Sequence, residues 1–295
     1  MATDRKSELN AWAKAEYEKA QVQSSATALS STRRCVNCGE DFDLELTGHV
    51  LKDAIRYKHI RACRPCRNAL AEQADREEQE SARAEVLARV ERSKAAANLP
   101  EKMRGLHFDT LEEDWQQKKA YHTVKAWAEG FPKDAHGYPS LILYSPSPGT
   151  GKTTLATCAA NEIITRLDGI ASVRYESGPG LGVRVRSTYN GGDEHEADVY
   201  RHLAGVKLLI LDDIGDDEKE KPSDASRRMY FTLIDERYQS GLPVIVVTNA
   251  SDKELGRFLG TYTLDRLMEM SGNTFTRVTG MSRQERIARG PGNAL

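Results

Sequence analysis

Residues 141–160 read LILYSPSPGTGKTTLATCAA, and this stretch decides the fold class of the chain. Its first four residues are apolar and predict a strand, while GTGKTT predicts a tight turn that opens a helix. This strand–loop–helix order is typical of a phosphate-binding loop, in which backbone N–H groups at a helix N-terminus face phosphate oxygens. The usual pattern begins with a glycine, and this chain has Pro146 in that place.

Pro146 precedes the residues that supply the phosphate contacts, so we expect the loop to bind ATP. A proline there fixes one φ angle and removes one N–H at the entrance of the loop. Lys152 is predicted to reach the β- and γ-phosphates, and the Thr153 hydroxyl to ligate Mg²⁺. The expected ATP-binding residues follow one another along the loop: Pro148, Gly149, Thr150, Gly151, Lys152, Thr153 and Thr154.

Two further apolar runs end in polar residues that suit ATP hydrolysis. VKLLILDD ends in Asp212, predicted to hold Mg²⁺ through water, and Asp213, predicted to polarise the attacking water. PVIVVTN ends in Asn249, which we place between that water and the γ-phosphate. The competing interpretation is a buried strand with polar residues at its end, and the phosphate-binding loop makes this the weaker one.

Short apolar runs alternate with helical stretches from about residue 99 onward. This alternation predicts an α/β fold, with a parallel sheet covered by helices on both faces. We therefore expect two parts: residues 1–98, with an N-terminal helix, a cysteine module and a connecting helix over 69–97, and an ATPase domain over 99–295.

Four of the 5 cysteines form two CxxC pairs close together in the sequence. Two such pairs supply the four thiolates of a closed, structural zinc site, which leaves no position for catalytic water. The alternatives are unligated cysteines or one redox-active pair. The expected Zn²⁺ ligands are Cys35, Cys38, Cys63 and Cys66.

The net charge of −2 hides local basic clusters, so it does not exclude nucleic-acid binding. No run of roughly 18 apolar residues occurs, which excludes a membrane-spanning helix. The first residues are charged and lack the apolar stretch of a secretory signal, so we expect a cytoplasmic location.

Over about residues 99–290 the chain resembles the DnaC/DnaI/IstB-type AAA+ ATPases, which are helicase loaders and transposition helpers. The matching stretches are YSPSPGTGKTTLA, LAGVKLLILDDIG, LIDERYQSGLPVIVVTNAS and RFLGTYTLDRLMEM. The resemblance implies an AAA+ ATPase that assembles with its own copies or related subunits. It also implies that Asn249 is the sensor 1 residue and that Arg266 is the arginine finger of a neighbouring subunit's site. Arg283 and Arg286 compete for the sensor 2 role.

The cysteine module resembles that of DnaI-type loaders in particular, whose N-terminal domain docks onto the replicative DNA helicase. We therefore expect a helicase loader that acts on single-stranded DNA. The alternatives are an IstB-type helper of transposition and a non-hydrolysing, nucleotide-stabilised adaptor. For single-stranded DNA contact the candidates are Arg184, Arg186 and Tyr189, and the competing interpretation of that segment is an ordinary amphipathic helix. Arg237, common in the family, is interpreted either as functional or as part of a surface ion pair.

Overall fold

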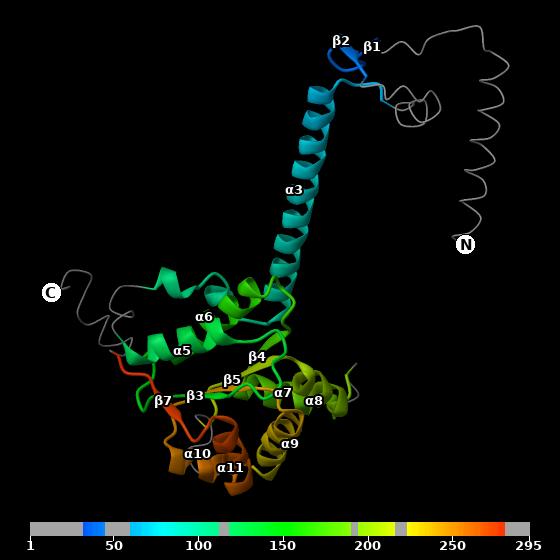
Figure 1. The fold of residues 1–295 in the computed structure, drawn as a ribbon. Coiled ribbons are helices and arrows are strands. Elements are labelled where there is room, and N and C mark those ends of the chain that lie inside the picture. Colours follow the sequence, from blue (N-terminus) through cyan, green and yellow to red (C-terminus); the bar gives the residue numbers. More distant parts are fainter. Residues whose placement is uncertain (1–31, 45–59, 112–117, 190–193, 216–222, 281–295) are drawn as a thin grey trace. The chain divides into compact units, whose positions relative to one another are not determined.

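The computed structural model describes residues 32–44, 60–111, 118–189, 194–215 and 223–280 (Figure 1). The chain divides into two compact units, Met1–Ala82 and Arg83–Leu295. The boundary between these two units falls inside one long helix. The sequence instead predicts a boundary at residue 98 between a partner-docking part and an ATPase domain, and this functional boundary stays a prediction. The expected N-terminal helix and the two sensor 2 candidates, Arg283 and Arg286, lie outside the described residues.

The first unit contains a short antiparallel hairpin followed by the start of the long helix. Strands β1 (Thr32–Arg34) and β2 (Asp41–Asp43) pair with Arg33 opposite Phe42. The turn between them includes Gly39 at φ 73°, a left-handed conformation that glycine adopts without steric cost.

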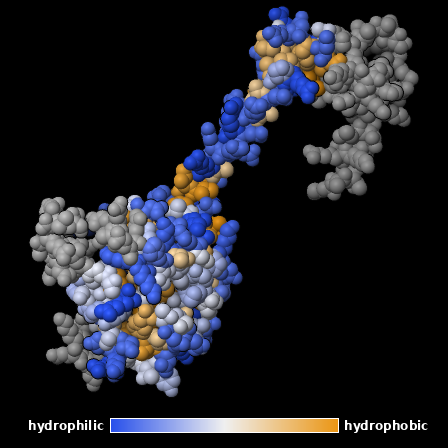
Figure 2. All heavy atoms as spheres, turned by 60° about the vertical axis from the view of Figure 1, so that its left-hand side comes forward, coloured by the Kyte–Doolittle hydropathy of each residue, from blue (hydrophilic) through white to orange (hydrophobic). Residues whose placement is uncertain are grey.

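Helix α3 (Arg64–Ala96) confirms the predicted connecting helix and begins five residues earlier than expected. Its Ala, Glu and Arg residues favour helix intrinsically, and Val90 is its buried residue. Most of its exposed length is hydrophilic (Figure 2). From Arg83 onward the helix belongs to the second unit, and it ends where Asn98 adopts φ 57°.

A five-stranded parallel sheet forms the centre of the second unit, in the order β4-β5-β6-β3-β7. Apolar residues on successive positions face opposite sides: Ile210 and Ile245 join one core cluster, and Leu211 and Val246 join the other. This is the continuous apolar pattern of a sheet buried on both faces. The strands are β3 (Leu141–Tyr144), β4 (Val173–Ser177), β5 (Leu208–Asp212), β6 (Val244–Thr248) and β7 (Phe275–Arg277).

Helices cover both faces of this sheet, as the sequence predicted (Figure 1). On one face pack α5 (Lys119–Gly130), α6 (Lys152–Arg166), the end of α3 and the 3-10 turn η2 (Phe108–Thr110). The 3-10 turn η1 (Glu101–Met103) contacts α6 through Met103. On the other face pack α7 (Gly178–Thr188), α8 (Glu196–Gly205), α9 (Asp224–Ser240), α10 (Asp252–Leu259) and α11 (Thr261–Met270). Among the described residues, no helix combines the length and apolar character needed to cross a bilayer.

Candidate nucleotide site and metal centre

The loop between β3 and α6 has the backbone of a phosphate-binding loop. Gly149 and Gly151 adopt φ angles of 73° and 95°, which lie in the region that a Cβ atom disfavours. Gly151 is the residue that precedes the first turn of α6, so the N–H groups that follow it point out of the helix end. Pro146 lies on the exposed entrance of the loop, and the Ser145 N–H before it donates to the Thr248 carbonyl at 3.3 Å. The proline therefore leaves the inner turn of the loop intact.

Lys152 is the buried cation of this loop, with 5% of its surface exposed. Its ammonium group donates to the Asn249 side-chain oxygen, and to the carbonyls of Ser145 at 3.4 Å and Ser147 at 3.3 Å. These contacts hold the ammonium group at the N-terminal end of α6. An anionic ligand such as the phosphates of ATP fits this arrangement.

Asp212 ends β5 and is 1% exposed, with each carboxylate oxygen bound by a donor. The Tyr175 hydroxyl donates to Oδ2 at 2.7 Å, and the Asp213 backbone N–H donates to Oδ1 at 2.9 Å. Burial and the neighbouring Asp212 charge raise the pKa of Tyr175, so its hydroxyl remains a donor. The sequence reasoning missed Tyr175, because only the pairing of β4 with β5 brings it beside Asp212.

Asp213 follows directly and is exposed, at φ 54°, a left-handed conformation that aspartate adopts more readily than most residues. Two adjacent acidic residues thus have different surroundings. Asp212 is buried and oriented by donors, as a group that holds Mg²⁺ through water requires. The carboxylate of Asp213 is accessible to solvent.

Strand β6 lies between β3 and β5, and this order places Asn249 in contact with Lys152. Thr248 has a structural role: its hydroxyl donates to the Ile214 carbonyl at 2.6 Å and accepts the Ala250 N–H at 2.9 Å. It thereby fixes the turn after β5 to the turn after β6. The phosphate-binding loop, Asn249 and the two aspartates therefore follow three neighbouring strands at the same edge of the sheet.

Arg266 lies in α11, where it forms an ion pair with Asp235 of α9. Its guanidinium group also lies over the rings of Phe231 and Tyr238, at 5.3 and 5.5 Å from their centroids. The structure thus holds Arg266 against α9 of its own chain, in a position fixed by three side chains.

Arg237 and Arg184 both bind groups of their own chain. Arg237 is fully buried, and its guanidinium group donates to the carbonyls of Leu203, Ala204 and Val206 and of Pro243. This corrects the interpretation of Arg237 as part of a surface ion pair. Arg184 lies in helix α7 and is bound by Glu176 and Glu194.

The four predicted zinc ligands lie together in the first unit. Their sulfur atoms all lie within 4.8 Å of one another, and Cys38 Sγ lies 3.7 Å from Cys63 Sγ. Tetrahedral zinc with bonds of ~2.3 Å separates two sulfurs by ~3.8 Å, so the spacing fits zinc and excludes a disulfide. The backbone N–H groups of Asn37 and Cys63 also donate to Cys35 Sγ, at 3.4 and 3.3 Å.

Backbone donors stabilise a thiolate in this cluster. The N–H groups of Cys38, Cys63 and Asn37 lower the pKa of Cys35 to about 6, with the Cys38 donor contributing most. Thiolate is the form that binds zinc, so the four cysteines fit a structural zinc ion in number and spacing, and Cys35 also fits it in its lowered pKa.

The parallel order β4-β5-β6-β3-β7, with a phosphate-binding loop after β3 and two acids after β5, defines a P-loop ATP-binding protein of the AAA+ class. Residues 76–284 match the family described as IstB-like ATP binding protein, and the chain belongs to that family.

The relatives of known structure or sequence are distant. The chain is 24% identical over 170 residues to "Replicative helicase loader DnaC" of Escherichia coli strain K12, a match that covers 56% of this chain and 65% of the relative. The solved "DnaC helicase loader" has a TM-score of 0.51 at 22% identity and covers 61% of this chain and 100% of that one. The solved "DnaI" has a TM-score of 0.52 at 17% identity, covering 65% and 99%. At these identities the solved structures establish the shared fold.

Proposed function

We propose that this chain is an ATPase that loads a replicative DNA helicase onto single-stranded DNA. The observation that carries the ATPase part is the contact of Lys152 with Asn249, beside the buried and hydrogen-bonded Asp212. Bound ATP and Mg²⁺ would supply the phosphoryl group and neutralise its oxygens, held by the phosphate-binding loop, Thr153 and Asp212.

The protein's own groups divide the remaining work. Lys152 offsets negative charge on the phosphates, and Asn249 orients both Lys152 and the attacking water. Asp213, exposed at the end of β5, accepts the proton of that water.

The test is Asp213→Asn, which keeps the shape of the side chain and removes its basicity. We expect nucleotide affinity to stay within about threefold of wild type, and turnover to fall by about 10²-fold or more. If wild type and the variant hydrolyse ATP equally slowly, the protein is the non-hydrolysing adaptor instead.

We further propose that Arg266 completes the nucleotide site of a neighbouring subunit. The ion pair with Asp235 and the two aromatic rings fix its position, and 29% of its side chain stays exposed. Mixing Arg266→Ala with Lys152→Ala subunits tests this, because each variant lacks a different half of the shared site. Partial rescue of turnover in the mixture supports the proposal, and turnover equal to the sum of the separate variants refutes it.

The loader role rests on similarity to DnaC and on the four-cysteine cluster, which we assign to docking on the helicase. The alternative is a helper of transposition, since the family description does not specify the process. Full-length protein should retain the host's replicative helicase in a pull-down. A Cys35→Ser, Cys63→Ser variant should lose it, while Lys152→Ala should keep it. Absence of binding by wild type would remove the loader role.

The three residues predicted to contact single-stranded DNA differ in their surroundings. Arg184 is occupied by two glutamates, whereas Arg186 and Tyr189 are exposed at the end of α7. We propose Arg186 for phosphate contact and Tyr189 for stacking on a base.

A further inference from the structure

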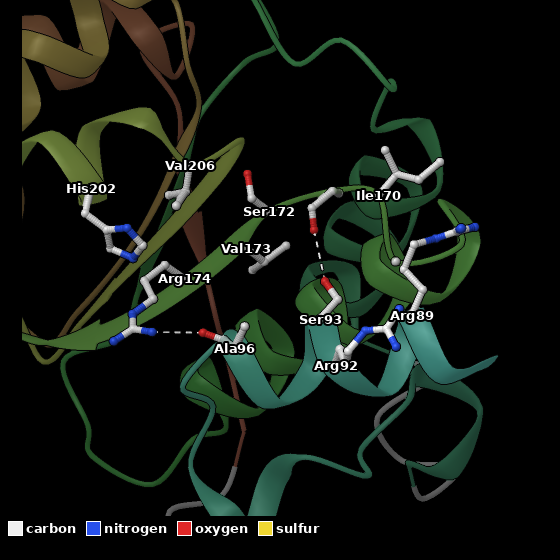
Figure 3. A pocket seen from close by; sticks show the side chains of 12 residues that line it. Arg89, Arg92, Ser93, Ala96, Ile170, Ser172, Val173, Arg174, His202 and Val206 are labelled. Atoms are coloured by element: carbon white, nitrogen blue, oxygen red, sulfur yellow. Dashed lines mark hydrogen bonds between the residues drawn. The ribbon is translucent and has the colours of Figure 1, made fainter. Parts of the chain in front are cut away.

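A cavity of about 360 Å³ opens between the end of α3, the turn after α6, the start of β4 and the end of α8 (Figure 3). Arg174 and His202 lie on one side of it, and Arg89 and Arg92 approach from α3. Its apolar wall includes Val173, Val206 and the exposed Ile170.

Among the residues that the structure describes, the lining of this pocket contains three arginines and no Asp or Glu, so its charge is positive. Two of the arginines are anchored by backbone carbonyls beside the pocket. Arg89 Nε donates to the Asp168 carbonyl at 2.6 Å, and Arg174 Nη1 donates to the Ala96 carbonyl at 2.9 Å. These bonds hold both guanidinium groups in place and use one N–H each of the five that an arginine carries.

One carboxylate lies close to these cations without lining the pocket. Glu176 binds Arg174 at 3.1 Å, but it also binds Arg184 at 3.0 Å, so its single charge is shared. Arg92 is exposed, which leaves its guanidinium group free to turn toward a ligand. The pocket therefore keeps an excess of about two positive charges, before any charge on His202 is counted.

Ser172 adds a neutral donor. Its hydroxyl oxygen accepts the Lys207 backbone N–H at 3.0 Å, and a serine hydroxyl can also donate one hydrogen bond. Guanidinium groups and a hydroxyl are donors without a competing acid, which is the composition of a phosphate site.

This pocket is separate from the nucleotide site. The phosphate-binding loop and Asp212 follow the C-terminal ends of β3 and β5, whereas the pocket lies at the N-terminal ends of β4 and β5. In a parallel sheet these ends form opposite edges, roughly 16 Å apart for a five-residue strand.

We propose that this pocket binds the phosphate group of a second ligand, distinct from the ATP of the phosphate-binding loop. A phosphate ester carries between one and two negative charges, which matches the excess of positive charge better than a single carboxylate does. The apolar wall suits a ligand with an apolar part beside its phosphate, such as a nucleotide. The phosphate belongs either to a free nucleoside phosphate or to a nucleic-acid strand. The proposal does not depend on ATP turnover.

The test uses full-length protein carrying Lys152→Ala, so that the phosphate-binding loop contributes little. The imidazole signals of His202, assigned by comparison with His202→Gln, report on the pocket in NMR titrations. The probes are tripolyphosphate, ADP, a single-stranded dT oligonucleotide and a poly-glutamate peptide. We expect at least one phosphate probe to shift the His202 signals and saturate.

Arg92→Glu should weaken that binding about tenfold or more, because it reverses a charge at the pocket without removing a packed side chain. Arg83→Glu is the matched control, since it makes the same charge change on the same helix outside the pocket, and it should leave the affinity within about twofold. Tighter binding of ADP indicates a free nucleotide, and tighter binding of the oligonucleotide indicates a strand. Saturation by the peptide alone, no saturation by any probe, or equal effects of the two variants would overturn the proposal.

Discussion

Replacing the buried Arg237 with methionine should destabilise the second unit strongly, although this residue is remote from the nucleotide loop. Methionine is similar in length and keeps much of the packing, but it donates no hydrogen bonds. Four buried carbonyls then lose their donor. Those of Leu203 and Ala204 belong to the last turn of α8, where a helix cannot satisfy its own carbonyls.

The magnitude follows from these carbonyls. A buried acceptor left unsatisfied costs about 1–3 kcal/mol, so four cost at least about 4 kcal/mol. Part of this is offset because the variant no longer buries a charge, and burial lowers the pKa of Arg237 to about 9. We therefore expect a net loss of about 3 kcal/mol in the free energy of unfolding. In a unit of this size, that lowers Tm by about 6–12 °C.

The assay is thermal and urea unfolding of the full chain, followed by circular dichroism at neutral pH. Arg201→Met, on the exposed side of α8, is the matched control and should change Tm by less than about 2 °C. A Tm for Arg237→Met within that range would show that the four carbonyls find other donors, and would refute the structural role of Arg237.

Three other predictions test separate parts of the molecule. Removing zinc with a chelator, or replacing Cys35 with serine, should unfold the module around the hairpin and change ATP affinity by less than about twofold. Metal content and intrinsic fluorescence check this, and a wild-type protein without zinc would contradict it. Gly169→Ala should destabilise the packing of the end of α3 within the second unit, because the added Cβ would lie 2.7 Å from the Arg89 carbonyl carbon and Gly169 adopts φ 71°. Proteolysis within residues 83–96 should become faster, and an unchanged rate would contradict the packing. Arg184 holds the pKa of Glu194 below its usual value, so this ion pair stabilises the fold above the ordinary glutamate pKa. Its contribution is lost as the pH falls through the lowered pKa of Glu194. The difference in the free energy of unfolding between wild type and Glu194→Gln should therefore shrink from pH 7 to pH 3, and a constant difference would contradict the pairing.

Local sequence patterns were sufficient for the parts of the fold that depend on neighbouring residues. The segment GTGKTT requires left-handed glycines before a helix, and Gly149 and Gly151 have that conformation. The helix over 152–166 begins directly after this turn, and each CxxC spacing keeps its own two sulfurs close together. In these cases the interactions that decide the structure lie within a few residues of one another.

Tertiary structure decided how these parts combine. The sequence order of the strands does not reveal that β6 lies between β3 and β5, and this order alone puts Asn249 on Lys152. Tyr175 reaches Asp212 only through the register of β4 with β5. An arginine in a sequence is usually predicted to be exposed. Arg237 is instead buried, and carbonyls from two separate segments accept its hydrogen bonds. Strand pairing and burial are set by the total apolar area that the whole chain removes from water, a quantity that no single segment carries.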